Sequence, residues 1–139
     1  MASPVDVKLI LCQSAAADSS QGTLHMLGAG WSITNSPTMP QAVALLIKVP
    51  WDRANQQLHI VVELLDADGS TVELAGPKVP QPVRAEADLE VGRPPGIAHG
   101  SPLDAAMALN FPALPLQPGR YQWRVSVADT TESESFTVR

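Results

Sequence analysis

Apolar and polar side chains alternate along much of this 139-residue chain. The alternation is clearest over residues 83–91, 103–111 and 119–127. A period of two buries one face of a β-strand and leaves the other face in water, so each segment is predicted to be a strand. Residues 42–49 are almost wholly apolar, which predicts a central strand covered on both faces. Further strands are predicted over 5–12, 23–34, 59–65, 71–74 and 135–138.

Prolines and turn-forming residues mark the connections between these segments. Nine of the thirteen prolines lie between Pro77 and Pro118. Helix interiors exclude proline because its ring removes an N–H donor and clashes with the preceding turn. Residues 66–69 (Asp-Ala-Asp-Gly) have the composition of a hairpin turn. Loops are predicted over 14–22, 76–82, 93–102 and 112–118.

One segment fits two periods. Apolar side chains from Trp51 to Leu65 are spaced as on one face of a helix, and Asp52 is placed to cap it. Residues 59–65 are nevertheless rich in strand-forming side chains and run directly into the predicted hairpin turn. The prediction is therefore a helical turn over residues 52–55, followed by a strand.

The number and spacing of these segments predict the fold class. Eight or nine short strands without an internal repeat are typical of an all-β, two-sheet antiparallel sandwich. Residues 116–121, followed by Trp123, resemble the turn and strand-start tyrosine of immunoglobulin-like domains. An immunoglobulin-like Greek key is the predicted topology and a jelly roll is its alternative, in a single domain spanning residues 1–139.

Charge and composition argue against several kinds of partner. The net charge is −5, and the nine Lys and Arg residues are scattered along the chain. Nucleic-acid backbones and anionic membranes are bound by clustered Lys and Arg, so neither partner is expected. No stretch approaches the roughly 18 apolar residues of a membrane-spanning helix. The single cysteine, Cys12, allows no intramolecular disulfide, which favours a soluble protein of the reducing cytoplasm.

The sequence carries no motif for catalysis, metal binding or cofactor binding. His25, His59 and His99 lack the close spacing of zinc ligands. Residues 28–30 (Gly-Ala-Gly) lack the third glycine and the following helix of a dinucleotide-binding loop. Neither a phosphate-binding P-loop nor the Gly-x-Ser-x-Gly elbow of hydrolases is present. No catalytic residue, metal or cofactor is predicted, and the protein is expected not to be an enzyme.

Two tryptophans and the loop 93–102 are the candidates for binding. Exposed aromatic rings can anchor sugars or protein partners. Long loops in small domains are often functional, and this one is stiffened by prolines. The candidate binding residues are Trp31, Trp51, Arg93, Ile97 and His99.

Five segments together resemble a known family. They are residues 27–32 (LGAGWS), 49–55 (VPWDRAN), 64–69 (LLDADG), 90–96 (EVGRPPG) and 118–123 (PGRYQW). The pattern resembles a family of small uncharacterised bacterial proteins, mostly actinobacterial, that form a domain of unknown function. The resemblance covers nearly the whole chain. It implies no activity, cofactor or catalytic residue.

These observations lead to three hypotheses of function. The first is a non-catalytic protein-interaction or assembly module, because open sandwiches have edge strands that must be protected or paired. Only 17% of the residues are charged, so a covered face in a homo-oligomer, or a protein partner, is expected. The second is a small-ligand or carbohydrate-binding module that uses Trp31 or Trp51 and the loop 93–102. The third, a hydrolase, requires His, Asp and Ser residues that only the fold can gather.

Overall fold

Strands dominate the computed structural model, which describes residues 3–76 and 79–139. A single short 3-10 turn, η1 (Trp51–Arg53), interrupts them within these residues. The strands form several open sheets, antiparallel apart from one short parallel pair. No helix in the described part of the chain is long and apolar enough to cross a membrane. The predicted all-β class is confirmed.

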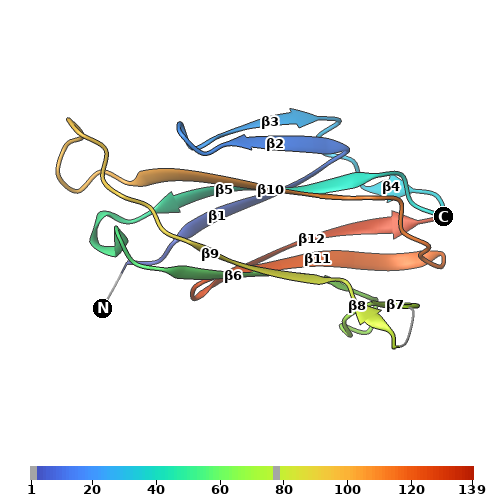
Figure 1. Cartoon of the computed structure of the whole chain (residues 1–139). Helices are drawn as coiled ribbons and strands as arrows, with labels where there is room; N and C mark the ends of the chain where they lie inside the picture. Colours follow the sequence, from blue (N-terminus) through green and yellow to red (C-terminus); the bar gives the residue numbers. More distant parts are fainter. Residues whose placement is uncertain (1–2, 77–78) are drawn as a thin grey trace.

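Two larger sheets lie in separate layers (Figure 1). The three-stranded sheet has the order β1 (Asp6–Cys12), β5 (Gln41–Val49), β10 (Leu103–Phe111). The five-stranded sheet has the order β4 (Ile33–Thr34), β12 (Thr130–Val138), β11 (Gly119–Val127), β6 (Leu58–Leu65), β9 (Arg84–Leu89). The chain therefore leaves the first sheet after β1, contributes β4 to the second, and returns with β5.

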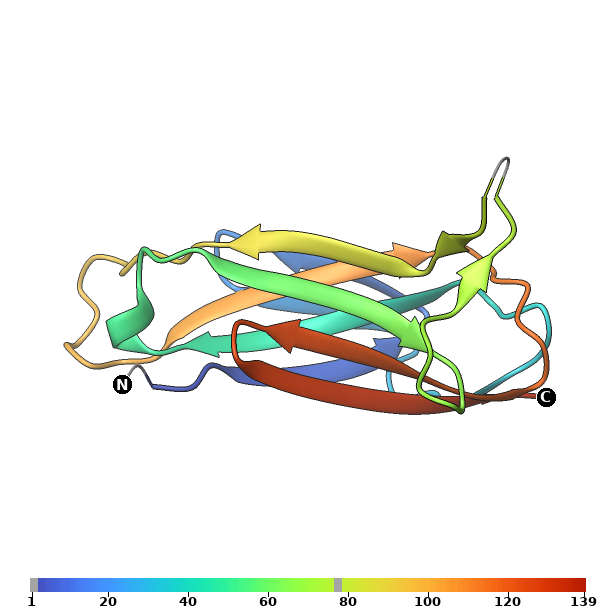
Figure 2. The same ribbon diagram turned by 90° about the horizontal axis from the view of Figure 1, so that it is seen from below.

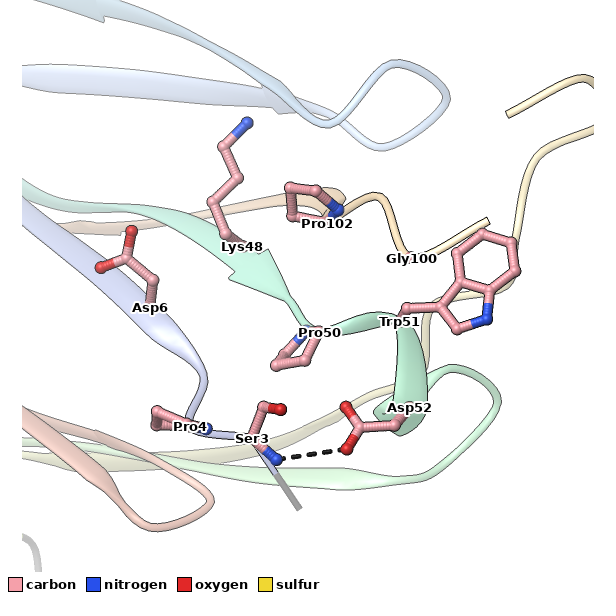
Figure 3. A pocket seen from close by; sticks show the side chains of 9 residues that line it. All are labelled: Ser3, Pro4, Asp6, Lys48, Pro50, Trp51, Asp52, Gly100 and Pro102. Carbon is pink, nitrogen blue, oxygen red and sulfur yellow. Dashed lines mark hydrogen bonds between the residues drawn. The ribbon is translucent and has the colours of Figure 1, made fainter. Parts of the chain in front are cut away.

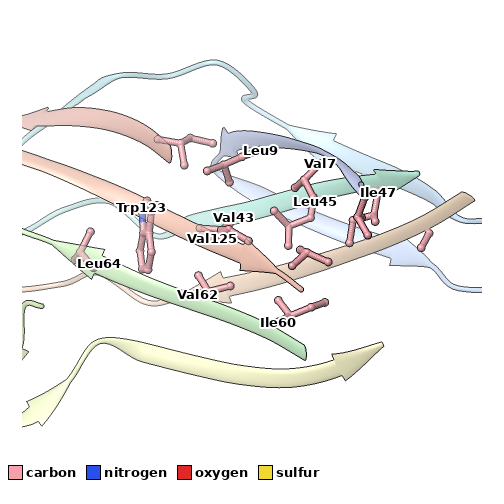
Figure 4. Packing of buried hydrophobic residues seen from close by; sticks show 14 of the residues in the cluster. Val7, Leu9, Val43, Leu45, Ile47, Ile60, Val62, Leu64, Trp123 and Val125 are labelled. Atoms are coloured by element: carbon pink, nitrogen blue, oxygen red, sulfur yellow. The ribbon is translucent and has the colours of Figure 1, made fainter. Parts of the chain in front are cut away.

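One hydrophobic cluster contains side chains of both larger sheets (Figure 4). The inward positions predicted by alternation supply it, for example Leu9 of β1 and Val125 of β11. Leu45 of β5 and Leu64 of β6 are completely buried in it. Burying side chains of this size stabilises the fold by about 1.5–3 kcal/mol each, so this cluster is the main source of stability.

Trp123 is completely buried in this cluster, and its polar atom is satisfied there. Its Nε1 donates to Gln41 Oε1 at 2.9 Å, and Gln41 Nε2 donates to Thr38 Oγ1 at 3.4 Å. Phe111 stacks on the tryptophan with ring centroids 4.6 Å apart. Because an unpaired buried donor costs about 1–3 kcal/mol, Gln41 is required where the alternation alone would place an apolar residue.

A hairpin covers the outer face of the three-stranded sheet and corrects two predictions. Residues 14–22 were expected to be a loop, but they contain β2 (Ser14–Asp18), which pairs with β3 (Thr23–Leu27). The strand predicted over 23–34 ends at Leu27, because Gly28 and Gly30 adopt φ values of 64° and 91° that extended strands do not use.

The hairpin is held by the side chain of Asn110 on β10. Asn110 Oδ1 accepts from Ala15 N at 3.1 Å, and Nδ2 donates to Ala15 O at 2.8 Å. A small buried cluster of Cys12, Ala15, Ala42 and Ala44 lies beneath β2. The prediction that β5 is covered on both faces is therefore confirmed.

Smaller differences concern the ends of elements. The helical turn predicted over 52–55 is η1, which begins one residue earlier. The loop predicted over 76–82 contains a two-residue strand, β8 (Gln81–Pro82), paired with β7 (Glu73–Leu74), and its residues 77–78 lie outside the described residues. The last strand begins at Thr130 instead of Ser135. The described residues hold β1 to β12, more than the predicted eight or nine strands, because several short strands lack alternation.

Candidate functional site

Three of the five predicted binding residues meet at one end of the molecule. Trp51 begins η1, directly after β5 and Pro50. The Arg93 guanidinium carbon lies 4.2 Å from the centroid of the Trp51 ring, and the His99 ring centroid lies 4.8 Å from it. Arg93 Nη2 also donates to Trp51 O at 2.7 Å. These contacts fasten the loop 93–102 to η1 and occupy part of the tryptophan surface that a sugar would stack on.

An open hollow of about 600 Å³ lies beside Trp51 (Figure 3). Its lining residues are Ser3, Pro4, Asp6, Lys48, Pro50, Trp51, Asp52, Gly100 and Pro102. Asp52 Oδ2 accepts from Ser3 N at 3.2 Å, and Lys48 pairs with Asp104. The hollow therefore combines proline walls with one indole, an ion-paired Lys48 and the carboxylates of Asp6 and Asp52.

Ile97 lies on another side of the same loop. It packs partly buried against the main hydrophobic cluster. With Pro94 and Leu89 it lines a second hollow of about 360 Å³, which runs along the beginning of β10 and the β2–β3 turn. The loop therefore reaches two surfaces, the Trp51 hollow and the gap between β9 and β10.

Trp31 is not brought to this site. Its ring packs on Phe136 with centroids 5.1 Å apart, and its Nε1 donates to Cys12 O at 3.1 Å. Phe136 and Cys12 lie near the ends of β12 and β1, whereas Trp51 contacts the opposite end of the three-stranded sheet. The contacts of Trp31 fasten the β3–β4 connection to both larger sheets.

The three histidines lie on separate elements. His25 is on β3, His59 on the exposed face of β6, and His99 in the loop 93–102. His59 Nδ1 lies 3.0 Å from Asp88 Oδ1, and this hydrogen bond raises the pKa of His59 above its usual value. In the described ranges, no group of three or more His, Cys, Asp and Glu side chains is placed to hold a metal ion.

Cys12 is completely buried, and its Sγ lies 3.7 Å from Ala42 O. Burial raises the pKa of the Cys12 thiol, because it disfavours the charged thiolate. The thiolate is the nucleophilic form of cysteine, so this position suits a packed side chain better than a reactive one.

One of the two open sides between the larger sheets lies between the edge strands β9 and β10. We call it the β9–β10 seam and define it by the inward-facing side chains of its two strands, which are Ala85, Ala87 and Leu89 of β9 and Met107, Leu109 and Phe111 of β10. All six are only partly buried. Both strands are edges of their sheets, and the described residues add no further strand to either edge (Figure 2).

The free edge of β9 presents backbone groups at every second residue. Leu64 N donates to Val83 O at 3.0 Å, in register with the β6–β9 ladder. In an antiparallel ladder, alternate residues bond to opposite sides. The N–H and C=O groups of Arg84, Glu86 and Asp88 therefore point away from β6, toward solvent.

Sequence reasoning missed the seam because alternation identifies which face of a strand is buried but not which strands are edges. One signal was present in residues 83–91, where the inward positions of β9 include two alanines. Small side chains cover little of an opposing layer, so they leave Met107 and its neighbours partly exposed.

Comparison with known proteins adds a family but no activity. No curated protein matches the chain significantly. Residues 8–139 match the model of a family of unknown function (DUF6941), in agreement with the resemblance to an uncharacterised domain. Since the match covers all but the first residues, the chain belongs to this family of unknown function.

Proposed function

We propose that this protein is a non-catalytic protein-interaction or assembly module. The observation that carries the proposal is the β9–β10 seam, where two unpaired strand edges lie beside partly exposed apolar side chains. Unpaired edges readily bond to a further strand, and apolar surface is stabilised when a partner covers it. A partner that adds a strand on this side satisfies both requirements.

We also propose that the two larger sheets form an immunoglobulin-like Greek-key sandwich. Naming β1, β5, β6, β10, β11 and β12 as A, B, C, E, F and G makes the sheet orders A–B–E and G–F–C, as in that fold. Tyr121 Oη donates to Gln117 O at 2.8 Å, which supports a tyrosine corner at the start of strand F. Trp123 then stands where immunoglobulin domains have their second cysteine, and the strand order favours this fold over the jelly roll.

The placement of ionisable groups supports a non-catalytic role. Arg124 lowers the pKa of Glu63, and Arg53 lowers that of Asp129, each through a direct ion pair. These two groups lie in separate ion pairs on strands and turns. His59 and Glu86, whose pKa values are also shifted, contact each other on the exposed outer face of β6 and β9. Active sites instead gather groups with shifted pKa values in one cleft, next to a nucleophile or an acid–base pair.

The cellular setting remains part of the proposal. We propose a cytoplasmic protein without nucleic-acid or membrane partners, because the net charge is −5 and the only cysteine is free and buried. The bacterial origin implied by the resemblance stays a prediction.

Affinity purification from the native host, followed by mass spectrometry, tests the interaction role. Ala87→Lys places a charge inside the seam, whereas the control Thr131→Lys places the same charge on the exposed face of β12. We expect the wild-type protein and Thr131→Lys to retain a bound protein or a second copy that Ala87→Lys loses. Equal recovery with both variants contradicts a role for the seam.

The hollow beside Trp51 favours a second candidate, a small-ligand or carbohydrate-binding module. Its volume of about 600 Å³ is in the range of small-molecule sites, and an indole lines it. Tryptophan fluorescence during a glycan and metabolite screen tests this candidate, with Trp51→Phe as the control that removes the reporting ring. The candidate fails if every ligand leaves the wild-type emission unchanged.

A further inference from the structure

We propose that the partner at the β9–β10 seam is a second copy of this chain, joined through β9 in an antiparallel strand pair with two-fold symmetry. The inference rests on the proposed interaction function and deepens it by naming the partner and the register. Its basis is the protection of the other edges, the free backbone groups of β9 and the order of charges along that strand.

The other strand edges of the larger sheets carry protection that β9 lacks. Glu132 and Glu134 lie on the core-facing side of β12, opposite Val125 and Trp123, and remain exposed. Inward-pointing charges of this kind discourage edge-to-edge pairing. The inward side chains of β1 are buried. Thr130 Oγ1 of β12 also donates a hydrogen bond at 2.8 Å to the carbonyl oxygen of Val5, the residue just before β1.

The edge of β10 is crowded by the hairpin. A Cβ atom placed on Gly22, in the β2–β3 turn, would lie 2.7 Å from Asp104 O. The turn therefore rests directly on the backbone near the beginning of β10, whereas no described strand pairs with the outer edge of β9. Of the two strands that border the seam, β9 is the more accessible to a partner strand.

The charges of β9 complement one another when two copies pair about Ala85. In that register each Arg84 lies opposite Glu86 of the second copy, and the outward N–H and C=O groups of both residues bond across the pair. A register centred on Ala87 places Glu86 opposite Asp88. A register centred on Glu86 places each Arg84 opposite Asp88, but it also places the two Glu86 carboxylates opposite each other. Like charges directly opposite destabilise a strand pair, so the pattern selects the first register.

The core-facing side of β9 also fits this register. Ala85 lies opposite its own copy and Ala87 opposite Val83, so the added strand presents small apolar side chains toward the partly exposed Met107 and Leu109. Pro82 has no N–H to donate, which confines the new ladder to the residues that follow it. Within one copy, Arg84 Nη2 contacts Glu86 Oε1 at 2.6 Å, so both side chains lie on the outer face of the strand.

Two single charge reversals test the register. Arg84→Glu leaves only acidic residues at the paired positions, and Glu86→Arg leaves only basic ones. Sedimentation velocity across a concentration series is expected to show a wild-type dimer and at least an about tenfold higher dissociation constant for each variant alone. An equimolar mixture of the two variants is expected to form a heterodimer, which native mass spectrometry identifies by its mass.

The double variant Arg84→Glu/Glu86→Arg restores complementary charges and is expected to dimerise again. Thermal unfolding of each variant shows whether a loss of dimer reflects a loss of folding. Heterodimer formation is a second check, because only folded chains can form it. A wild-type chain that stays monomeric at high concentration, an unchanged dimer in Arg84→Glu, or no heterodimer in the mixture overturns the proposal. If the chain is monomeric but Ala87→Lys still loses a protein partner, only the second-copy inference fails and the interaction function stands.

Discussion

The two open sides of the layered sheets differ in how well their apolar side chains are covered. On the β1–β12 side, Val7, Leu9 and Leu11 expose 5%, 9% and 4% of their surface, and β1 lies close to β12. On the β9–β10 side, the six seam residues are all partly exposed, and the two strands do not lie as close together. The hydrophobic core is thus covered on the β1–β12 side, which we call the sealed margin, and partly exposed to solvent on the β9–β10 side, which we call the unsealed margin.

The inward side chains of the two edge strands β12 and β9 also differ in polarity. The inward positions at the beginning of β12 are Thr130, Glu132 and Glu134, polar side chains that interact with water or with the backbone beside β1. The inward positions of β9 carry only apolar side chains. Because inward-pointing charge discourages edge pairing, we expect the β1–β12 side to exclude a partner strand and the β9–β10 side to accept one.

Equivalent leucine truncations on the two sides measure this difference most directly. Leu9→Ala is expected to lower the free energy of unfolding by about 2–4 kcal/mol, because it leaves a cavity in the sealed margin. Leu109→Ala is expected to cost about 1 kcal/mol, because part of its side chain is already in water. Urea unfolding at concentrations where only the monomer is present provides both values. Equal losses would mean that the margins are packed alike.

Removing the hydroxyl that links β12 to the chain beside β1 tests the sealed side alone. Thr130→Val keeps the side-chain shape but deletes the hydrogen bond to Val5 O, and it is expected to lower the free energy of unfolding by about 1 kcal/mol. Ser133→Ala, at an exposed position of the same strand, is the control and is expected to change the free energy of unfolding by less than about 0.5 kcal/mol. The link is unimportant if the two variants have the same midpoint in urea.

Converting the sealed side into an open one tests the role of the inward carboxylates. Glu132→Val/Glu134→Val is expected to change the free energy of unfolding by less than about 0.5 kcal/mol, since both side chains are exposed. The same variant is expected to self-associate through β12, which light scattering detects as a mass that rises with concentration. The control, Glu132→Gln/Glu134→Gln, retains polar side chains and should associate less. Unchanged mass in the valine variant would show that the carboxylates do not protect this edge.

The smallest expected effect concerns His59 of β6 and the two carboxylates of β9 that lie beside it, Asp88 and Glu86. The hydrogen bond from His59 to Asp88 raises the pKa of His59 in the folded protein, and nearby Glu86 adds to the effect. The stability that protonated His59 contributes is complete below its usual pKa near 6.5 and is lost as pH rises through the higher folded value. The melting temperature of wild-type protein, relative to His59→Gln, should therefore fall slightly between pH 6 and pH 8. A difference that grows with pH would contradict this assignment.

Sequence patterning predicted the long strands because each has one buried and one wet face. β11 alternates as expected, and residues 42–47 of β5 are all apolar because layers cover both faces of this strand. β2 escaped prediction because its Ala-Ala-Ala run has no strand preference of its own, and its extended form depends on Asn110, 95 residues away from Ala15. The beginning of β12 was not predicted because this edge strand has glutamates at inward positions, where a central strand would have apolar residues.

The candidate site was predictable only in part, because it also depends on contacts between segments that are far apart in the sequence. The proline-rich composition of residues 93–102 identified a stiff loop, and Arg93 and His99 both lie in it. Their contact with Trp51 depends on how the end of β5 meets that loop, which local periodicity does not encode. The seam depends on the lateral order of strands, so only the assembled sheets reveal it.

The short parallel pairing of β4 with β12 has a mechanical consequence. Ser32 O and Thr34 O accept hydrogen bonds from Thr137 N and Arg139 N at 2.8 and 2.9 Å. A pull applied through Arg139 along the strand axis stretches these bonds together in shear instead of opening them one after another. The terminal strand is thereby clamped to a segment that continues into the buried middle strand of the other layer, so tension at this end is shared by both sheets.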